Sequence, residues 1–388
     1  MFKVIRIILA LADLFFRRNR KRVAIPCIND DEWQGNCAFL YQHLLKYQDN
    51  WGIEIVVLSG RYSKLKNNAD IGDNIYSLYS FRGLVYLFTS GVVIYHHGPL
   101  AGRVPILPWR RISFHINHGV HYKKVELALD SKPKRLELSS FVKTKWFSPY
   151  HSVSSHIDAL SCCTYYHTKL KDIFVTGIPR NDAFFQGESA NFPSTLRSDL
   201  IKLDEISQGK KIIAYAPTWR SNGGGYDFSG EELKKLVGLL ESKNAILCYA
   251  GHPYLKCRKV PSSEGFVDFN FNFNDIQSLL VRADLLITDY SSVWIDFLLR
   301  GKPVVSFQFD RATYRDERGF LFDTDTIFPG DIVEDFSELL EAIEKNLVQE
   351  KIEHPQYAYV KHMFHEFEDG DNCQRVATAI ASLAGWDR

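Results

Sequence analysis

Short runs of apolar residues recur along the chain, and each is followed by a turn and then by a stretch with helical spacing. An unbroken apolar run of about four to eight residues is typical of a strand that is covered on both faces. We expect such strands at residues 23–26, 53–58, 91–95, 112–116 and 173–176, and again at 211–215, 245–249, 285–288 and 303–307. The helical stretches between them include residues 231–241, 276–282 and 293–300. This alternation predicts an α/β chain whose parallel sheets have helices on both faces.

The series of strands and helices occurs twice, which predicts two doubly wound, Rossmann-like domains that face a cleft. The chain has 388 residues, and roughly 150 residues per domain is the usual expectation. Residues 186–209 are polar with little periodicity, so we expect them to link one domain at 23–205 to another at 206–388. The helical end of the chain, residues 357–386, would pack back across both domains. Doubly wound sheets bind ligands where their strands end.

The first 22 residues combine an apolar stretch with a basic cluster. Residues 1–16 are fewer than the roughly 20 apolar residues that a spanning helix needs, and Arg6 and Asp13 interrupt them. A block of cations at 17–22 follows, instead of a small-residue cleavage site. This order predicts an amphipathic helix at residues 1–22 on an anionic inner leaflet, and hence a peripheral protein at the cytoplasmic face. The alternative is a first helix that packs on the body of the protein, with a solvated basic edge.

Charge and cysteine content bear on the class of partner. The formal net charge of +1 gives no general attraction for nucleic acid, so we expect no nucleic-acid partner. Seven cysteines are present without the spacing of a zinc site, which favours reduced thiols in a cytosolic protein.

Three strand ends in the second half carry polar side chains. Ser291 and Ser292 would lie at the start of a helix, where free backbone N–H groups and the helix dipole attract anions. Thr218 and Arg220 follow another strand, and an arginine there can hold a phosphate in a bidentate manner. His252 follows a third strand. Each could be an ordinary cap, surface arginine or structural histidine, but three such ends in one domain together favour a phosphate site.

In the first half, His118 and Gly119 follow an expected strand, and Lys123 and Lys124 come shortly after them. Glycine lets a substrate approach the backbone closely, and a neutral histidine can accept a proton from an attacking hydroxyl. The other histidines that the sequence leaves open as this base are His96, His97 and His121.

Taken in order, these segments resemble the CDP-glycerol glycerophosphotransferase family of teichoic-acid primases and polymerases. The family's His-Gly element with two following lysines looks like residues 118–124, and its Tyr-Ala-Pro-Thr-Trp-Arg element is the same as residues 215–220. Further segments similar to family elements are 177–182, 252–253, 288–293, 301–305, 318–323 and 329–330. Many elements in the same order make a chance likeness improbable.

The resemblance implies a GT-B-like fold with a CDP-alcohol in the C-terminal domain. It implies that His118 is the general base for the acceptor hydroxyl and that His252 is a second catalytic residue, at the pyrophosphate. Lys123 and Lys124 would lie on the acceptor side, and Asp182 belongs to a matching motif near the hinge. The donor and phosphate residues that the resemblance implies are Arg180, Thr218, Arg220, Asp289, Ser291 and Ser292.

The implied reaction moves glycerol phosphate, or a related polyol phosphate, from a CDP-alcohol to a polyprenyl-diphosphate-linked glycan and releases CMP. It belongs to the synthesis of teichoic acid or of a capsule or other surface polymer. Such transfer depends on positioning and on charge stabilisation, so we expect no metal and no cofactor. The pair Asp323 and Asp325 would then be structural or contact the donor.

Two alternatives remain at this point: a nucleotide-sugar-dependent glycosyltransferase of the same fold, and a non-catalytic membrane-bound scaffold of a glycan assembly complex. Asn117 stands where a tryptophan often precedes the family's His-Gly pair, so the acceptor is less defined than the donor. The sequence does not distinguish glycerol from ribitol or another polyol, or a primase from a polymerase. It also leaves the acceptor glycan and the oligomeric state open.

Overall fold

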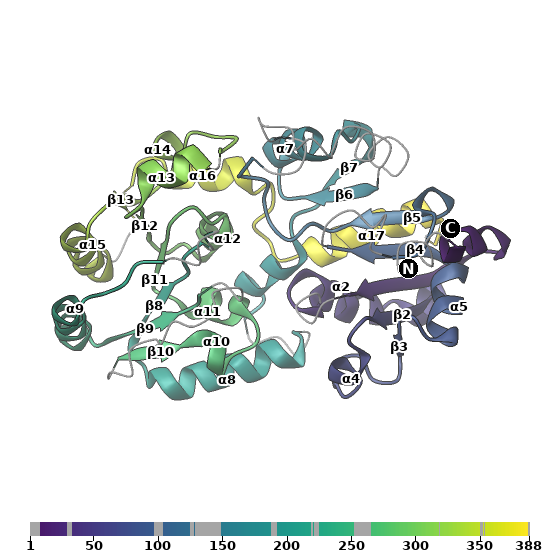
Figure 1. Ribbon diagram of the computed structural model, residues 1–388, viewed down its shortest axis with the longest axis horizontal. Helices are drawn as coiled ribbons and strands as arrows, with labels where there is room; N and C mark the ends of the chain where they lie inside the picture. Colours follow the sequence, from purple (N-terminus) through teal and green to yellow (C-terminus); the bar gives the residue numbers. More distant parts are fainter. Residues whose placement is uncertain are drawn as a thin grey trace. The chain divides into compact units, whose positions relative to one another are not determined.

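A computed structural model of the chain describes residues 8–28, 33–96, 104–124, 128, 149–187, 192–218, 220, 225–251, 265–317, 319–349, 352 and 354–386. The chain divides into two compact units, and each is built on one parallel sheet (Figure 1). Unit 1 combines Met1–His121, Val125–Ser194 and His365–Arg388, and unit 2 combines Tyr122–Lys124 and Thr195–Phe364.

In unit 1, the described residues form a seven-stranded sheet with the order β3-β2-β1-β4-β5-β6-β7. Its strands are β1 (Asn19–Cys27), β2 (Glu54–Ser59), β3 (Ile75–Ser77), β4 (Ser90–Tyr95), β5 (Ile112–His115), β6 (Tyr150–Val153) and β7 (Ile173–Val175). Its helices are α2 (Asn36–Leu45), α3 (Gln48–Trp51), α4 (Tyr62–Leu65), α5 (Phe81–Thr89), α7 (His156–Tyr166) and α17 (Asn372–Ala384), and its 3-10 turns are η1 (Asp13–Phe15), η3 (Pro108–Arg110), η5 (Leu170–Asp172) and η6 (Pro179–Phe184).

Both faces of this sheet are buried. Along β1, Val23 and Ile25 belong to a core that includes residues of α2 and α17, whereas Ala24 belongs to a core with residues of α5. Successive side chains of a strand point to opposite faces, so an unbroken apolar run packs against helices on both faces of the sheet. This is the physical reason that the strands could be found from apolar runs.

In unit 2, the described residues form a six-stranded parallel sheet with the order β10-β9-β8-β11-β12-β13. Its strands are β8 (Lys211–Tyr215), β9 (Ala245–Tyr249), β10 (Phe266–Asp268), β11 (Leu285–Thr288), β12 (Val304–Phe307) and β13 (Asp331–Val333). Its helices are α8 (Ser194–Ser207), α9 (Gly230–Ser242), α10 (Phe269–Asn272), α11 (Ile276–Arg282), α12 (Val293–Phe297), α13 (Arg311–Glu317), α14 (Thr324–Ile327), α15 (Phe336–Val348) and α16 (Tyr357–Phe364), with the 3-10 turn η7 (Leu298–Arg300). At the centre of this sheet the strands lie in the order β9-β8-β11-β12. This order makes β8 and β11 neighbours, although about 70 residues separate them in the chain.

The units differ from the expected domains in three places, one of which is Tyr122–Lys124, a segment of the expected first domain that counts with unit 2. The expected linker contains α8, and the boundary between the units falls near its start, so this helix counts with unit 2. At the other end, α16 belongs to unit 2 and α17 to unit 1. Both oxygens of Asp182 hold α17 there, because they accept the backbone N–H groups of Asn372 and Cys373 at 2.8 and 2.9 Å.

The N-terminal segment is helical over residues 8–15 and packs on unit 1. Leu9 and Phe16 pack against the core that contains α5, and the buried Asp13 forms ion pairs with Arg18 and Arg111. The expected basic cluster at 17–22 leads into β1, which begins at residue 19. These contacts agree with the alternative expectation, a first helix that packs on the body of the protein. No helix among the described residues is long and apolar enough to cross a membrane.

Candidate active site

The loop after β11 holds the two serines that the sequence singled out. The strand ends at Thr288, α12 begins at Val293, and Ser292 is the residue at the helix start, as expected. Its side chain makes no capping hydrogen bond, and the Val293 N–H donates weakly to Ser291 Oγ at 3.4 Å. Both serines are half-buried. Their hydroxyls thus lie at the carboxyl end of a central strand, where this kind of sheet binds ligands.

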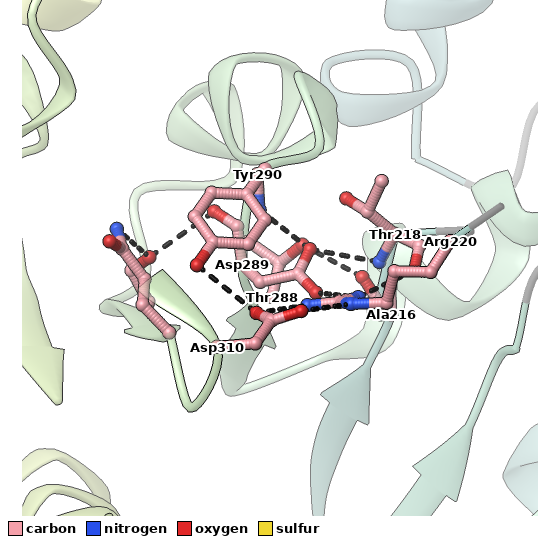
Figure 2. A network of polar contacts seen from close by, with 9 residues as sticks. Ala216, Thr218, Arg220, Thr288, Asp289, Tyr290 and Asp310 are labelled. Carbon is pink, nitrogen blue, oxygen red and sulfur yellow. Dashed lines mark hydrogen bonds and ion pairs between the residues drawn. The ribbon is translucent and has the colours of Figure 1, made fainter. Parts of the chain in front are cut away.

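Asp289 joins the β8 and β11 loops at this sheet edge (Figure 2). Its Oδ1 accepts the backbone N–H groups of Thr218 and Tyr290 at 2.8 and 2.6 Å, and its Oδ2 accepts Arg220 Nη1 at 2.7 Å. The carboxylate is almost completely buried. Asp289 therefore holds the backbone just ahead of the serines.

Arg220 is bound on two sides by carboxylates (Figure 2). Besides its bond to Asp289, it donates through Nε and Nη2 to the two oxygens of Asp310 at 2.7 and 2.9 Å. Burial alone would lower the pKa of Arg220, but the hydrogen bonds to Asp310 and the charge of Asp289 outweigh it and raise that pKa. Only 6% of Arg220 is exposed. The guanidinium of Arg220 donates its hydrogen bonds to protein carboxylates. This geometry favours a positioning role over the bidentate phosphate contact that the sequence suggested.

Thr218 presents a buried hydroxyl at the same place. Its backbone is held by Asp289, and its Oγ1 has no hydrogen-bond partner among the residues that the structure describes. Burying an unsatisfied hydroxyl costs about 1–3 kcal/mol. A ligand oxygen or a water molecule at this position would remove that cost.

Aromatic rings surround the guanidinium of Arg220. The ring of Phe309 lies 4.7 Å from its central carbon, and those of Tyr290 and Tyr314 lie at 5.5 and 5.6 Å. Tyr290 and Tyr314 stack on each other with centroids 3.8 Å apart. Tyr290 also donates its hydroxyl to Asp310 at 3.2 Å, and burial together with the charges of Asp310 and Asp289 raises the pKa of that hydroxyl.

In unit 1, the loop after β5 carries the exposed His118. Just before it, Asn117 takes a left-handed conformation (φ 46°), which asparagine tolerates better than most residues. Asn36 Nδ2 donates to the carbonyl of Asn117 at 2.7 Å, and Asn36 Oδ1 accepts the backbone N–H of Arg180 at 3.1 Å. Asn36, which the sequence did not indicate, thus brings the His118 loop and the Arg180 motif together. The Arg180 side chain itself is half-buried.

Asp158, at the start of α7, anchors the other side of this loop. Its Oδ1 accepts the backbone N–H of His121 at 2.9 Å and lies 2.7 Å from His121 Nδ1, while its Oδ2 accepts the Ser154 N–H at 2.9 Å. His121 is buried, in contrast to His118. A carboxylate that orients an imidazole is a common arrangement in catalysis, so His121 stays open as a base, whereas His118 has the exposure that an acceptor needs.

Two further histidines are buried below this loop. His115 Nδ1 lies 3.3 Å from His151 Nδ1, and the Nε2 atoms of both rings have no partner among the described residues. Burial, and secondarily nearby imidazoles, lower the pKa of His115 well below its ordinary value and that of His151 to about 3. Both rings are therefore neutral at physiological pH. His96 is buried as well.

His97 and His252 lie outside the described residues. Lys123 and Lys124, which we expected on the acceptor side, belong to unit 2. Asp323 caps α14, and Asp325 pairs with Arg311. Among the residues that the structure describes, no three histidine, cysteine or carboxylate side chains are grouped as metal ligands would be.

Three functional positions were missed by sequence reasoning. Asp310 follows the end of β12, so the strand-end rule applied to β8 and β11 could have found it. Asp158 and Asn36 act through contacts with residues 37 and 81 positions away. No local pattern points to them.

Comparison with known proteins gives matches along nearly the whole chain. The sequence is 26% identical over 387 residues to a teichoic acid poly(glycerol phosphate) polymerase of Bacillus spizizenii, which covers 94% of this chain and 92% of that protein. It is likewise 26% identical to a teichoic acid ribitol-phosphate primase of the same organism, over 93% of this chain and 91% of that protein. Other relatives are longer: the match to the ribitol-phosphate polymerase TarL of Staphylococcus aureus is 31% identical, over 50% of this chain and 34% of that protein.

Solved structures show the same architecture. The wall teichoic acid polymerase TagF superposes with a TM-score of 0.80 at 18% identity, over 98% of this chain and 93% of that one. A UDP complex of MnaA from S. aureus superposes with a TM-score of 0.57 at 14% identity, over 94% of this chain and 97% of that one. At these identities the likeness concerns the fold, and it confirms the GT-B-like class that the sequence predicted.

The family comparison agrees with the motifs. The sequence profile described as CDP-glycerol:poly(glycerophosphate) glycerophosphotransferase matches residues 8–382. This range includes both sheets, Asp289 with the two loops that it joins, and the His118 loop. The chain therefore belongs to the CDP-glycerol:poly(glycerophosphate) glycerophosphotransferase family.

Proposed function

We propose that the protein transfers glycerol phosphate, or a related polyol phosphate, from a CDP-alcohol to a hydroxyl group of a lipid-linked glycan and releases CMP. The observation that carries the proposal is the set of hydrogen bonds by which Asp289 joins the loops after β8 and β11. Asp289 accepts the backbone N–H groups of Thr218 and Tyr290, so the Thr218 hydroxyl and the two serines lie at one sheet edge, in a chain that belongs to this family. Teichoic-acid polymerases and primases among the relatives support the same reaction class.

In the proposed reaction, the acceptor oxygen attacks the phosphorus of the transferred group. The bond from this phosphorus to the bridging oxygen of CMP breaks, and His118 takes the acceptor proton. Thr218, Ser291 and Ser292 donate hydrogen bonds to phosphate oxygens, where charge develops in the transition state. His252 supports the diphosphate. Arg220 acts here through Asp289, whose position it fixes.

The reaction can be tested with purified protein and a lipid-linked acceptor in detergent. CDP-glycerol, CDP-ribitol and a UDP-sugar are supplied separately, and released nucleotide is measured with and without acceptor. We expect acceptor-dependent CMP from one CDP-alcohol and none of the UDP product. Turnover of the UDP-sugar alone would assign the chain to nucleotide-sugar glycosyltransferases, and silence with all donors would favour the scaffold.

A lipid-linked acceptor requires the protein to work at a membrane, and we propose that its N-terminal segment contacts the inner leaflet. The side of this helix that faces away from the core exposes four large apolar side chains: Ile8, Leu11, Leu14 and Phe15. Exposed cations follow at Arg17, Arg20 and Lys21. Apolar side chains beside cations suit an anionic membrane surface.

Point variants test this contact better than deletion, because removing residues 1–22 would also remove the start of β1. Leu11→Ser combined with Phe15→Ser should weaken sedimentation with vesicles that contain phosphatidylglycerol. Leu160→Ser is a matched control, since Leu160 is 60% exposed on α7. Equal sedimentation of all three proteins would remove the proposed contact while leaving the proposed reaction intact.

A further inference from the structure

The chain passes from unit 1 to unit 2 between His121 and Tyr122, shortly after the proposed base His118. On the unit 1 side, Asp158 Oδ1 accepts the backbone N–H of His121 at 2.9 Å and lies 2.7 Å from the Nδ1 atom of its ring. On the unit 2 side, the Tyr122 carbonyl accepts the backbone N–H of Leu321 at 3.1 Å. Backbone contacts therefore hold the chain on both sides of this one peptide bond.

Tyr122 connects this crossing to the helix that follows the two serines. Its ring packs edge-on against Trp294, with centroids 5.7 Å apart, and its hydroxyl lies 2.8 Å from Thr324 Oγ1. Tyr122 and Trp294 are both almost completely buried. Trp294 belongs to α12, the helix that begins at Val293, directly after Ser292. Tyr122 thus packs on the helix that starts at the proposed phosphate site.

A second crossing of the chain has the same anchors. The chain passes from unit 2 to unit 1 between Phe364 and His365. In unit 2, the ring of Phe364 also packs edge-on against Trp294, with centroids 5.8 Å apart. In unit 1, His365 Nδ1 lies 3.0 Å from Ser154 Oγ, and the Ser154 N–H donates to Asp158 Oδ2 at 2.9 Å. Trp294 in unit 2 and the pair of Ser154 and Asp158 in unit 1 therefore hold both crossings.

The covalent chain limits how far the proposed base can lie from Tyr122. Four residues in extended conformation span at most about 14 Å. The Cα atom of His118 therefore lies within about 14 Å of the Cα atom of Tyr122, whatever the arrangement of the two units. Residues 118–122 form a short tether from the base to the donor-site helix.

We infer that Tyr122 is a positioning residue, which ties the His118 loop to the start of α12 and so sets the reach of the base toward the phosphorus. The inference rests on the proposed function. The donor side does not depend on this tether, because Asp289 holds the backbone of Thr218 and Tyr290 within unit 2. A longer tether should therefore slow the transfer step and leave donor binding unchanged.

The test inserts two glycines between His121 and Tyr122, which lengthens the tether and keeps both anchor residues. We expect the rate at saturating CDP-glycerol and lipid-linked acceptor to fall roughly 10- to 100-fold, because a small misplacement of a reacting group can cost that much. The affinity for CDP-glycerol, measured by titration calorimetry, should equal that of the wild type. A second variant, Tyr122→Ala, removes the ring and the hydroxyl from their contacts and should lower the rate by a similar factor.

A matched control inserts two glycines after Gly209, just before β8 begins at Lys211 and thus at the opposite end of this strand from Thr218. A side chain added at Gly209 would meet open space, so this protein should bind CDP-glycerol and release CMP like the wild type. If the wild type releases no CMP with acceptor, the proposed function fails. If the wild type is active and the insertion before Tyr122 keeps its rate, or loses donor affinity by the same factor as rate, Tyr122 is not a positioning residue.

Discussion

The two units each bury a polar cluster at their parallel sheet, and the two clusters are built in opposite ways. In unit 2, the arginine cluster of Arg220, Asp289 and Asp310 consists of charges that face each other at 2.7–2.9 Å. In unit 1, the histidine cluster of His115 and His151 consists of neutral rings that contact each other. Both Nε2 atoms of the histidine cluster lack partners among the described residues, whereas the guanidinium is bonded through all three of its nitrogens.

This difference separates a rigid site from a titratable one. Removing one partner of a buried ion pair destabilises the fold, because the other charge is left buried and unpaired. A buried imidazole is compatible with the fold only while it is neutral, since a proton would bring an uncompensated charge into the core. We therefore expect unit 2 to respond strongly to substitution and weakly to pH, and unit 1 to respond to mild acid.

The largest effect is expected from Arg220→Met, which leaves two carboxylates without their partner. Loss of one member of a buried ion pair costs about 3–5 kcal/mol. We expect the free energy of unfolding of unit 2 to fall by this amount, measured by urea denaturation at neutral pH. A loss below about 1 kcal/mol would mean that the cluster is hydrated and does not hold the β8 and β11 loops together.

Acid should destabilise unit 1 through the histidine cluster. Burial keeps the pKa of His151 near about 3 and that of His115 well below its ordinary value, while in the unfolded chain both rings bind protons below about pH 6.5. Below that pH the unfolded state binds more protons, so stability is lost as pH falls. We expect a loss of about 2–3 kcal/mol between about pH 7.5 and about pH 5.5 in denaturation experiments.

The variant His151→Phe separates this cause from general acid effects. Phenylalanine keeps a ring against Tyr166, which stacks on His151 with centroids 4.9 Å apart. The variant should lose about half as much stability over the same pH range, because one of two titrating rings is gone. An unchanged pH dependence would show that other groups are responsible.

Asp158→Asn should have an intermediate effect on stability. The new amide group must face either the His121 side or the Ser154 N–H, so at least one donor loses its acceptor. We expect unit 1 to lose about 1–3 kcal/mol. The rate at saturating donor should fall roughly 10- to 100-fold because the His118 loop shifts, with donor affinity unchanged. A loss of donor affinity instead would contradict a positioning role for Asp158.

The smallest effect is expected from Arg282→Ala, a control for the arginine cluster. Arg282 contacts Asp204 through Nε and Nη2, both at 2.8 Å, with the same fork geometry that Arg220 uses toward Asp310. Its pair is partly exposed, and exposed pairs contribute about 0–1 kcal/mol. If Arg282→Ala cost as much as Arg220→Met, burial would not be what distinguishes the two pairs.

Much of the fold could be predicted from the sequence, because strands with two buried faces are unbroken apolar runs. All nine expected strands are present. The strands that were missed are short and only partly apolar: β3, β6, β10 and β13. Their position depends on hydrogen bonds to a neighbouring strand, which a run of three or four residues does not reveal.

The candidate site was only partly predictable. The loops that carry Thr218, Arg220 and Ser291 followed from the rule that ligands bind at strand ends. The partner of Arg220 did not, because Asp310 is 90 residues away and only the order of the strands brings them together. Lys123 was assigned by its neighbours in the chain, whereas its backbone pairs with residues near Phe320.

The role of His118 as the base is tested most directly by comparing CMP release from CDP-glycerol by the wild type, His118→Ala and His121→Ala, with lipid-linked acceptor present. Because His118 is exposed and His121 is buried against Asp158, we expect His118→Ala to unfold like the wild type. Its rate should fall about 10²- to 10⁴-fold, the usual contribution of a general base. The His121→Ala enzyme should be less stable and should keep more activity. Full activity in His118→Ala, with the loss in His121→Ala, would contradict this assignment and make the buried histidine the base.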